Sequence, residues 1–109
     1  MNTESPKAQL RKGVLELCIL AIIAEKDSYS SDIIEKLKDA ELIVVEGTLY
    51  PLLTRLKNDG LLTYRWEESR TGPPRKYFQI TESGSGYLDT LIRDWSELVI
   101  SVDNLVRKS

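Results

Sequence analysis

Side chains suited to phosphate and base recognition gather in one stretch, residues 47–62, which reads GTLYPLLTRLKNDGLL. It supplies hydroxyls, a phenol, an amide and cations, at Thr48, Tyr50, Thr54, Arg55, Lys57 and Asn58. Such groups form hydrogen bonds with phosphate oxygens and with base edges. On a helix they would lie on and beside one polar face. An ordinary amphipathic surface helix would show the same pattern, so both interpretations stand on these residues alone.

Catalytic and metal-binding chemistry finds little support in the sequence. The chain has no histidine, which removes the imidazole general base and any Cys/His metal set. Cys18 is the single cysteine and lies inside an apolar segment, where we expect a small core residue. Glu67 and Glu68 are neighbours on a predicted strand and therefore point to opposite faces. We expect neither an enzyme, nor a bound metal, nor a cofactor.

Length and composition predict one soluble domain. The chain has 109 residues, of which 41% are apolar and 29% charged. No apolar run reaches the ~20 residues of a membrane span, since Val14–Ala24 is short and contains Glu16. Residues 1–12 lack the apolar block of a signal peptide, and a single cysteine fits a reducing compartment. We therefore expect a cytoplasmic protein without membrane contact.

The net charge of −2 conceals an uneven distribution of charge along the chain. Residues 13–47 carry a net charge of −5, whereas residues 48–76 carry +3 and residues 1–12 carry +2. Local patches govern phosphate binding more than the total charge does. Positive charge is concentrated at the N-terminus and around residues 47–62, which favours a nucleic-acid partner there.

The first half of the chain reads as two helices. Residues 8–25 are apolar nearly all round in their second half, which predicts a central, buried helix. A second helix is predicted from Tyr29 to about Lys38, with Ser28 as its N-cap and Asp32 in its first turn. Ser30 and Ser31 near its start could meet phosphates, and simple solvent exposure explains them equally well.

A third short helix follows the extended apolar segment 42–45. Its apolar face has the spacing i, i+3, i+4, i+7, at Leu49, Leu52, Leu53 and Leu56. Pro51 would lie near the first turn at little cost, and Gly60 provides the stop.

After Gly60 the pattern changes to period two. Leu62, Tyr64 and Trp66 predict a strand, residues 69–74 a loop, and residues 75–80 a returning strand. Two helices and a hairpin after a buried first helix are the order of a winged helix-turn-helix. A hairpin with this charge would place its cations on DNA, although a solvated hairpin is the plain alternative.

Several motifs in order resemble the PadR family of bacterial transcriptional regulators. They are GTLYPLLTRL from Gly47, DGLL from Asp59, Trp66, GPPRKY from Gly72 and ITESG from Ile80. The resemblance runs from about Leu10 to the C-terminus. The chain departs from the family at Ser30, where a small glycine-like residue is common, and in the apolar segment 42–45.

The resemblance implies a winged-helix homodimer that binds operator DNA, usually as a repressor and sometimes released by a phenolic or drug-like effector. The DNA-binding residues that it implies, together with those suggested by position, are Tyr29, Ser30, Ser31, Thr48, Tyr50, Thr54, Arg55, Lys57, Gly72, Pro73, Pro74, Arg75 and Lys76. A compact dimer without an activation segment favours repression.

A last helix, from 82 to about 107 with Thr81 as N-cap, carries a long apolar stripe in steps of three and four. A small monomer would leave this stripe bare, so we expect a second copy of the chain to cover it. The predicted dimer-interface residues are Leu10, Val14, Leu17, Leu88, Leu91, Ile92, Trp95, Leu98, Val99, Val102, Leu105 and Val106.

These elements form a mainly α fold with a small β-hairpin. Residues 1–81 are the expected winged helix-turn-helix DNA-binding domain, and residues 82–109 the dimerisation helix packed with the first helix. A planar aromatic effector could stack on Trp95, with Val14, Leu15, Cys18 and Val99 as walls, and Trp95 as plain interface core is the competing interpretation. The alternative function is a winged-helix module for protein contacts, with the acidic residues 13–47 as its surface.

Overall fold

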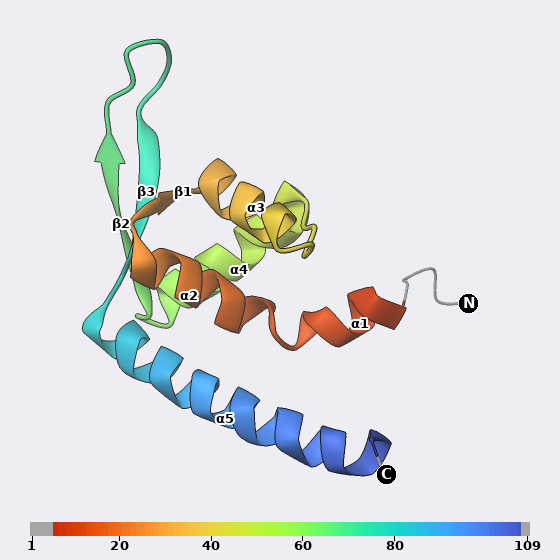
Figure 1. The fold of residues 1–109 in the computed structure, drawn as a ribbon. Coiled ribbons are helices and arrows are strands. Elements are labelled where there is room, and N and C mark those ends of the chain that lie inside the picture. Colours follow the sequence, from red (N-terminus) through yellow and green to blue (C-terminus); the bar gives the residue numbers. More distant parts are fainter. Residues whose placement is uncertain (1–5, 108–109) are drawn as a thin grey trace.

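The computed structural model describes residues 6–107, so the outer ends of the predicted segments 1–81 and 82–109 lie outside the described residues. In chain order the elements are α1 (Pro6–Lys12), α2 (Leu15–Glu25), β1 (Ser28–Tyr29), α3 (Ser30–Asp39), α4 (Glu46–Asn58), β2 (Leu62–Glu67), β3 (Arg75–Ile80) and α5 (Glu82–Val106). Helices α2, α3 and α4 form a body from which the β2–β3 hairpin rises, and α5 extends away below it (Figure 1).

The prediction of one continuous first helix over residues 8–25 is wrong, because the structure divides this segment into α1 and α2. The break falls at Gly13 and Val14, where the Val14 N–H donates to the Arg11 carbonyl at 2.9 Å. Glycine is one of the weakest helix formers, which explains the position of the break. The second half of the segment is central as predicted, with buried side chains at Leu15, Ile19, Leu20 and Ile23.

Helix α3 begins directly after strand β1, which contains Ser28, the residue that was predicted to be its N-cap. Ser28 and Tyr29 form β1, and the Ser28 hydroxyl donates to the Lys26 carbonyl at 2.7 Å, so the prediction that Ser28 caps α3 is wrong. The N-cap is Tyr29. Asp32 lies in the first turn as predicted, and its carboxylate accepts the Tyr29 N–H at 3.0 Å. This bond satisfies a backbone donor at the start of the helix.

The connection from α3 to α4 begins with a left-handed residue. The Leu42 N–H donates to the Leu37 carbonyl at 2.7 Å, which closes α3 in a Schellman motif. Glu41 takes the position that glycine usually occupies in this motif, with φ 62°. Residues 42–45 then run without regular secondary structure, and Val44 anchors them in the core.

Helix α4 contains the stretch that the sequence singled out. It starts at Glu46, so Pro51 lies inside the helix and the Gly47 carbonyl has no N–H partner one turn later. At its end Gly60 has φ 78°, and the Leu61 N–H donates to the Leu56 carbonyl at 2.9 Å. The predicted glycine stop is therefore confirmed.

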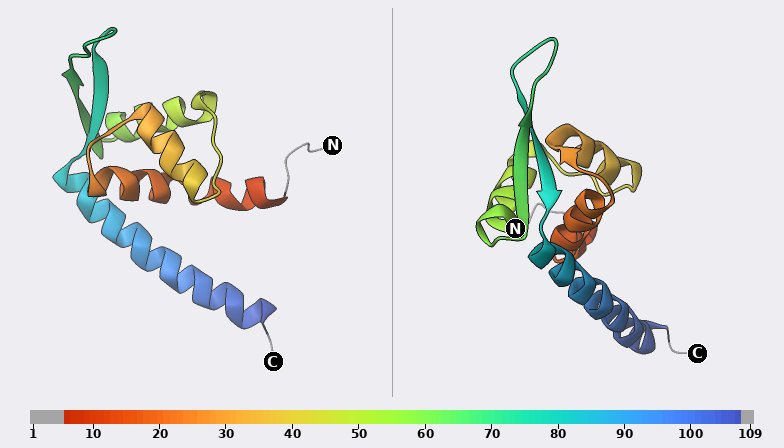
Figure 2. Two further views of the ribbon diagram at one scale, coloured as in Figure 1. Left: turned by 45° about the horizontal axis from the view of Figure 1, so that its top comes forward. Right: turned by 90° about the vertical axis from the view of Figure 1, so that its left-hand side faces the viewer.

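The hairpin belongs to a three-stranded antiparallel sheet with strand order β1-β3-β2. The sequence predicted β2 and β3 but not the two-residue β1, which pairs Ser28 with Phe78. In the hairpin Tyr64 lies opposite Phe78, and Trp66 lies opposite Lys76. The hairpin projects well beyond the helices in both views of Figure 2. We call residues 62–80 the wing.

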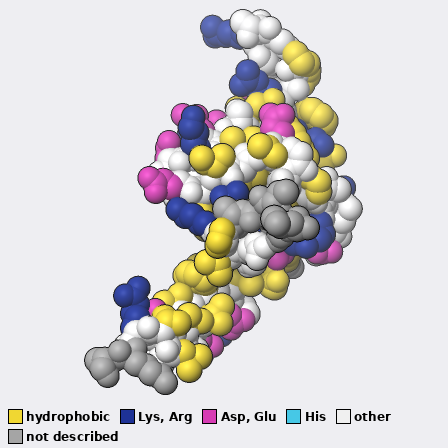
Figure 3. Space-filling view, turned by 90° about the vertical axis from the view of Figure 1, so that its right-hand side faces the viewer, with side chains coloured by type: hydrophobic (Ala, Val, Ile, Leu, Met, Phe, Trp, Pro, Cys, Tyr) yellow, Lys and Arg dark blue, Asp and Glu magenta, His cyan; other side chains and the backbone are white. Residues whose placement is uncertain are grey.

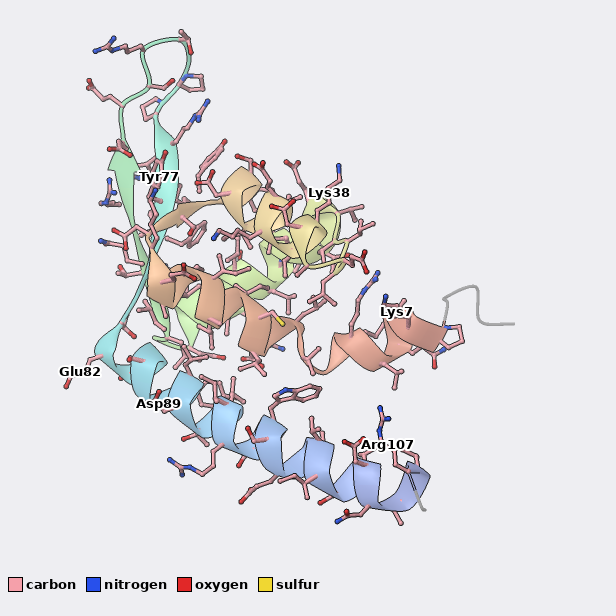
Figure 4. All side chains as sticks on the ribbon, in the orientation of Figure 1. Lys7, Lys38, Tyr77, Glu82, Asp89 and Arg107 are labelled. Carbon is pink, nitrogen blue, oxygen red and sulfur yellow. The ribbon has the colours of Figure 1, made fainter. Side chains whose placement is uncertain are left out.

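Helix α5 is anchored at its first turn. The Thr81 hydroxyl oxygen accepts the Gly84 N–H at 3.0 Å, which confirms Thr81 as the N-cap. The same hydroxyl donates to the Gly60 carbonyl at 2.6 Å. From Glu82 beside the sheet, α5 runs along α2 and then beyond it toward Arg107 (Figure 4).

The core lies among α2, α3, α4, the sheet and the first turns of α5. Its buried hydrophobic members are Leu15, Ile19, Leu20, Ile23, Ile33, Leu37, Val44, Leu49, Leu53, Leu56, Leu62, Phe78 and Leu88. A helix-rich body with a small antiparallel sheet confirms the predicted winged helix-turn-helix fold. Within residues 6–107, no helix combines the length and apolarity needed to cross a lipid bilayer.

Candidate nucleic-acid interface

Helix α4 has one buried face and one open face. Leu49, Leu53 and Leu56 are at most 1% exposed and hold the helix against the core. The polar residues expected to bind DNA from this helix are all exposed, at Thr48, Tyr50, Thr54, Arg55 and Lys57. The helix is therefore fixed from behind and free in front, as a recognition helix must be.

A groove of about 350 Å³ separates this helix from the wing. We call it the α4–wing groove. Its lining residues are Tyr29, Ser30, Tyr50, Leu53, Thr54, Lys57, Asn58, Tyr64, Trp66, Pro74, Arg75, Lys76 and Phe78. Three separate segments thus converge here: the start of α3, helix α4 and the strands of the wing out to the start of its loop.

The cations of the groove are stacked on its aromatic rings. The Lys76 ammonium lies 4.3 Å from the Tyr64 ring centre, and the Arg75 guanidinium lies 5.0 Å from the Tyr29 ring centre. Lys57 approaches Tyr64 from the helix side at 5.8 Å. Among the described residues, none of these three cations forms an ion pair. The groove therefore presents positive charge that is held in place but not neutralised.

Ser30 does not face solvent, contrary to both interpretations of the sequence. It is 3% exposed, and its hydroxyl lies 2.9 Å from the Tyr50 hydroxyl in a hydrogen bond. The bond ties the start of α3 to the outer face of α4. We therefore correct the prediction for Ser30 from a phosphate contact to a residue that orients Tyr50. Ser31 is exposed at the same helix start.

Five of the predicted residues do not line the groove: Ser31, Thr48, Arg55, Gly72 and Pro73. The Arg55 guanidinium turns back to the Glu16 carboxylate of α2, at 3.2 Å. Thr48 is exposed but does not line the groove, and Gly72 and Pro73 lie toward the exposed tip of the wing. Arg55 is thus the one predicted cation of α4 that is already paired.

Sequence reasoning missed the contribution of Tyr64 and Trp66 to the site. It used both as evidence for a strand, and Trp66 also as one motif of the resemblance, but it placed neither at the site. Their period-two spacing places both side chains on one face of β2, and the hairpin register sets Trp66 opposite Lys76. That combination of spacing and register was a signal in the sequence that could have found them.

The residues of the predicted dimer and effector sites divide between core and surface. Leu15 and Leu88 are 5% and 6% exposed, so their own chain already covers them. This burial corrects the prediction of Leu15 as a wall of the effector site and of Leu88 as a residue of the dimer interface. Burial raises the pKa of the Cys18 thiol, which makes the reactive thiolate scarcer at neutral pH. The exposed residues of the predicted dimer interface are Leu10 on α1 and, on α5, Ile92, Trp95, Leu98, Val102, Leu105 and Val106.

A second, larger hollow of about 800 Å³ has the opposite charge. Its carboxylates come from Glu25, Asp27, Asp32, Glu35, Asp39 and Glu67. It has Arg65 and Tyr77 in its lining, which belong to the sheet face turned away from α4. Within residues 6–107, no cluster of His, Cys, Asp and Glu side chains has the arrangement to hold a metal ion.

Comparison with known proteins agrees with this geometry. The family model described as the transcriptional regulator PadR-like family matches residues 19–90. A PadR-like transcription factor of Bacteroides fragilis is 56% identical over 92% of this chain and 97% of that chain, with a TM-score of 0.78. A PadR-like transcriptional regulator of Bacillus cereus is 36% identical over 93% of this chain and 99% of that chain, with a TM-score of 0.82.

A PadR family transcriptional regulator of Eggerthella lenta is 30% identical over 93% of this chain and 88% of that chain, with a TM-score of 0.85. The family model matches about two thirds of the chain, and the similarity to the solved structures extends over 92–93% of it. The chain belongs to the PadR-like family of transcriptional regulators.

Proposed function

We propose that this regulator binds operator DNA with α4 in the major groove and the wing on the neighbouring phosphate backbone. The observation that carries the proposal is the α4–wing groove, where Lys57, Arg75 and Lys76 lie together and none has an acidic partner among the described residues. Exposed Thr54 and Asn58 lie on the same surface of α4 and suit contacts to bases.

Salt dependence of binding tests the proposal. Each phosphate contact that is lost should make the log–log salt slope about 0.9 less negative. Arg75→Ala/Lys76→Ala should therefore weaken binding to the DNA upstream of the protein's own gene and flatten the slope by about 1.8. A gel-shift or anisotropy titration at several salt concentrations measures both.

The matched control is Lys26→Ala/Lys36→Ala, which removes two cations from the acidic hollow and should leave the slope unchanged. An unchanged slope in the wing variant would refute the wing assignment. A folded protein that binds no DNA at all would favour the alternative, a module for protein contacts that uses the acidic hollow.

We further propose a homodimer that represses transcription in the cytoplasm. Residues 82–109 would be the dimerisation helix, since α5 leaves its own body with an apolar side uncovered. Figure 3 shows hydrophobic side chains along the arm that projects below the body. A second chain would set two copies of α4 against successive turns of the major groove, about 34–36 Å apart.

Trp95 is our proposed effector site for a planar aromatic or phenolic ligand. It is 44% exposed in mid-stripe on α5, with Cys18, Val14 and Val99 as partly buried candidates for the walls. Stacking of a ligand on Trp95 near the two-fold axis would alter the distance between the two wings. Flat aromatic cations should quench tryptophan fluorescence, and Trp95→Ala should abolish this quenching. Equal quenching in the variant, which keeps only Trp66, would exclude the Trp95 site.

A further inference from the structure

Lys76 sits in a corner made by two aromatic rings of the neighbouring strand. Its ammonium lies 4.3 Å from the centre of the Tyr64 ring and 5.3 Å from that of Trp66. The two rings meet edge to face, with their centroids 6.0 Å apart and their planes at 87°. Because both ring faces attract a cation, the corner restricts a side chain that is otherwise very flexible.

The other face of the same hairpin offers a comparison. There the Arg65 guanidinium lies 5.1 Å from the Tyr77 ring centre, again a cation over an aromatic ring. Arg65, however, is also paired with Asp27 at 3.6 Å and Glu67 at 3.5 Å. Lys76 has no carboxylate partner within residues 6–107. Arg65 and Lys76 thus share a stacking geometry, but of these two cations only Lys76 is free of a carboxylate partner within residues 6–107.

Trp66 is unusual in its exposure. It is 62% exposed although it is the largest apolar side chain of the wing. A tryptophan that only filled the core would be covered by its own chain. Its position opposite Lys76 in the strand register gives it a direct partner in the α4–wing groove.

We propose that Tyr64 and Trp66 are positioning residues that hold the Lys76 ammonium in the α4–wing groove, ready for a phosphate of the DNA backbone. The inference rests on the proposed DNA binding and adds to it. Lys76 also lines the α4–wing groove, so a phosphate that enters the groove can contact its ammonium while the rings hold it. Because the side chain is ordered before the DNA arrives, less conformational entropy is lost on binding.

The experiment is a double-mutant cycle in the full-length protein, with a random-sequence DNA duplex and the DNA upstream of its own gene as probes. Trp66→Thr removes the ring and introduces a β-branched residue suited to a strand. We expect Trp66→Thr to weaken binding about three-fold on both duplexes, and Trp66→Phe to restore most of the loss. Lys76→Ala should weaken binding more and flatten the log–log salt slope by about 0.9.

The deciding measurement is the double variant. If Trp66 acts through Lys76, Trp66→Thr/Lys76→Ala should bind no more weakly than Lys76→Ala alone. A three-fold loss that persists in full without Lys76 would assign Trp66 a purely structural or direct role and would overturn the proposal. Trp66→Thr that binds as tightly as the parent protein would also overturn it.

Arg65→Ala is the matched control, since it removes a stacked cation from the opposite face of the same hairpin. It should leave the salt slope unchanged, and a slope change equal to that of Lys76→Ala would contradict the assignment to one face. A parent protein without DNA affinity would refute the proposed function itself. Additive losses in a parent protein that binds DNA would refute only the role of the rings.

Discussion

At the scale of single residues, two glycines of α5 differ in the space available for a side chain. A Cβ atom on Gly84 would run into the Leu61 carbonyl oxygen and would lie 2.8 Å from Ile80 Cγ1, whereas a Cβ on Gly86 would meet nothing within 4 Å. Gly84 therefore permits the close approach of α5 to the turn before β2. Gly86 has no such role in the chain.

Gly84→Ala should lower the free energy of unfolding by about 1–3 kcal/mol, because backbone atoms must shift to accommodate the methyl group. Gly86→Ala should raise it by about 0.5–1 kcal/mol, since alanine favours the helix. Thermal unfolding followed by circular dichroism would show a lower Tm for the first variant and a slightly higher Tm for the second. Shifts of the same sign would contradict the close contact at Gly84.

At the scale of elements, the sequence predicted most of the fold because its patterns are long or strongly periodic. The four leucines of α4 and the alternation of β2 identify those elements, and Gly60 and Thr81 mark boundaries through local chemistry. The open face of α4 followed from the same spacing. These features depend on neighbours in the sequence, so no tertiary information was needed.

The remaining elements depend on contacts that the sequence does not reveal. Strand β1 has only two residues, too few for a period, and it exists because β3 offers an edge beside it. Because Ser28 pairs with Phe78 in this sheet, it does not cap α3 as predicted. Ser30 was predicted as a surface residue because its partner, Tyr50, lies 20 positions away in the sequence. The ion pair of Arg55 was missed for the same reason, because its partner Glu16 is distant in the sequence and lies beside it only in the folded chain.

At the scale of the whole molecule, the distal half of α5 is the feature that a single chain leaves incomplete. Ile92, Trp95, Leu98, Val102 and Leu105 are between 44% and 72% exposed. They follow one another along the helix in steps of three and four, so they share one side. Leu91, Leu98 and Leu105 recur every seven residues, as in helices that pair with another helix. Leu88 is a member of the core and Leu91 packs against it, so the stripe continues from the core along the helix.

Leu98→Asp/Leu105→Asp should convert the proposed dimer into a monomer. Burial of each leucine stabilises by roughly 1.5–3 kcal/mol, so four leucines per dimer account for about 6 kcal/mol or more. The dissociation constant should therefore rise by about four powers of ten, and sedimentation equilibrium would report the mass of one chain.

Ile100→Asp is the matched control, because Ile100 is 62% exposed on the other side of the same helix. It should leave the dimer intact. If the parent protein already sediments as one chain, or if Ile100→Asp dissociates the dimer as completely as the double variant, the stripe is not the dimer interface. Operator binding should weaken together with dissociation, since two linked copies of α4 engage DNA with a far higher effective concentration than one.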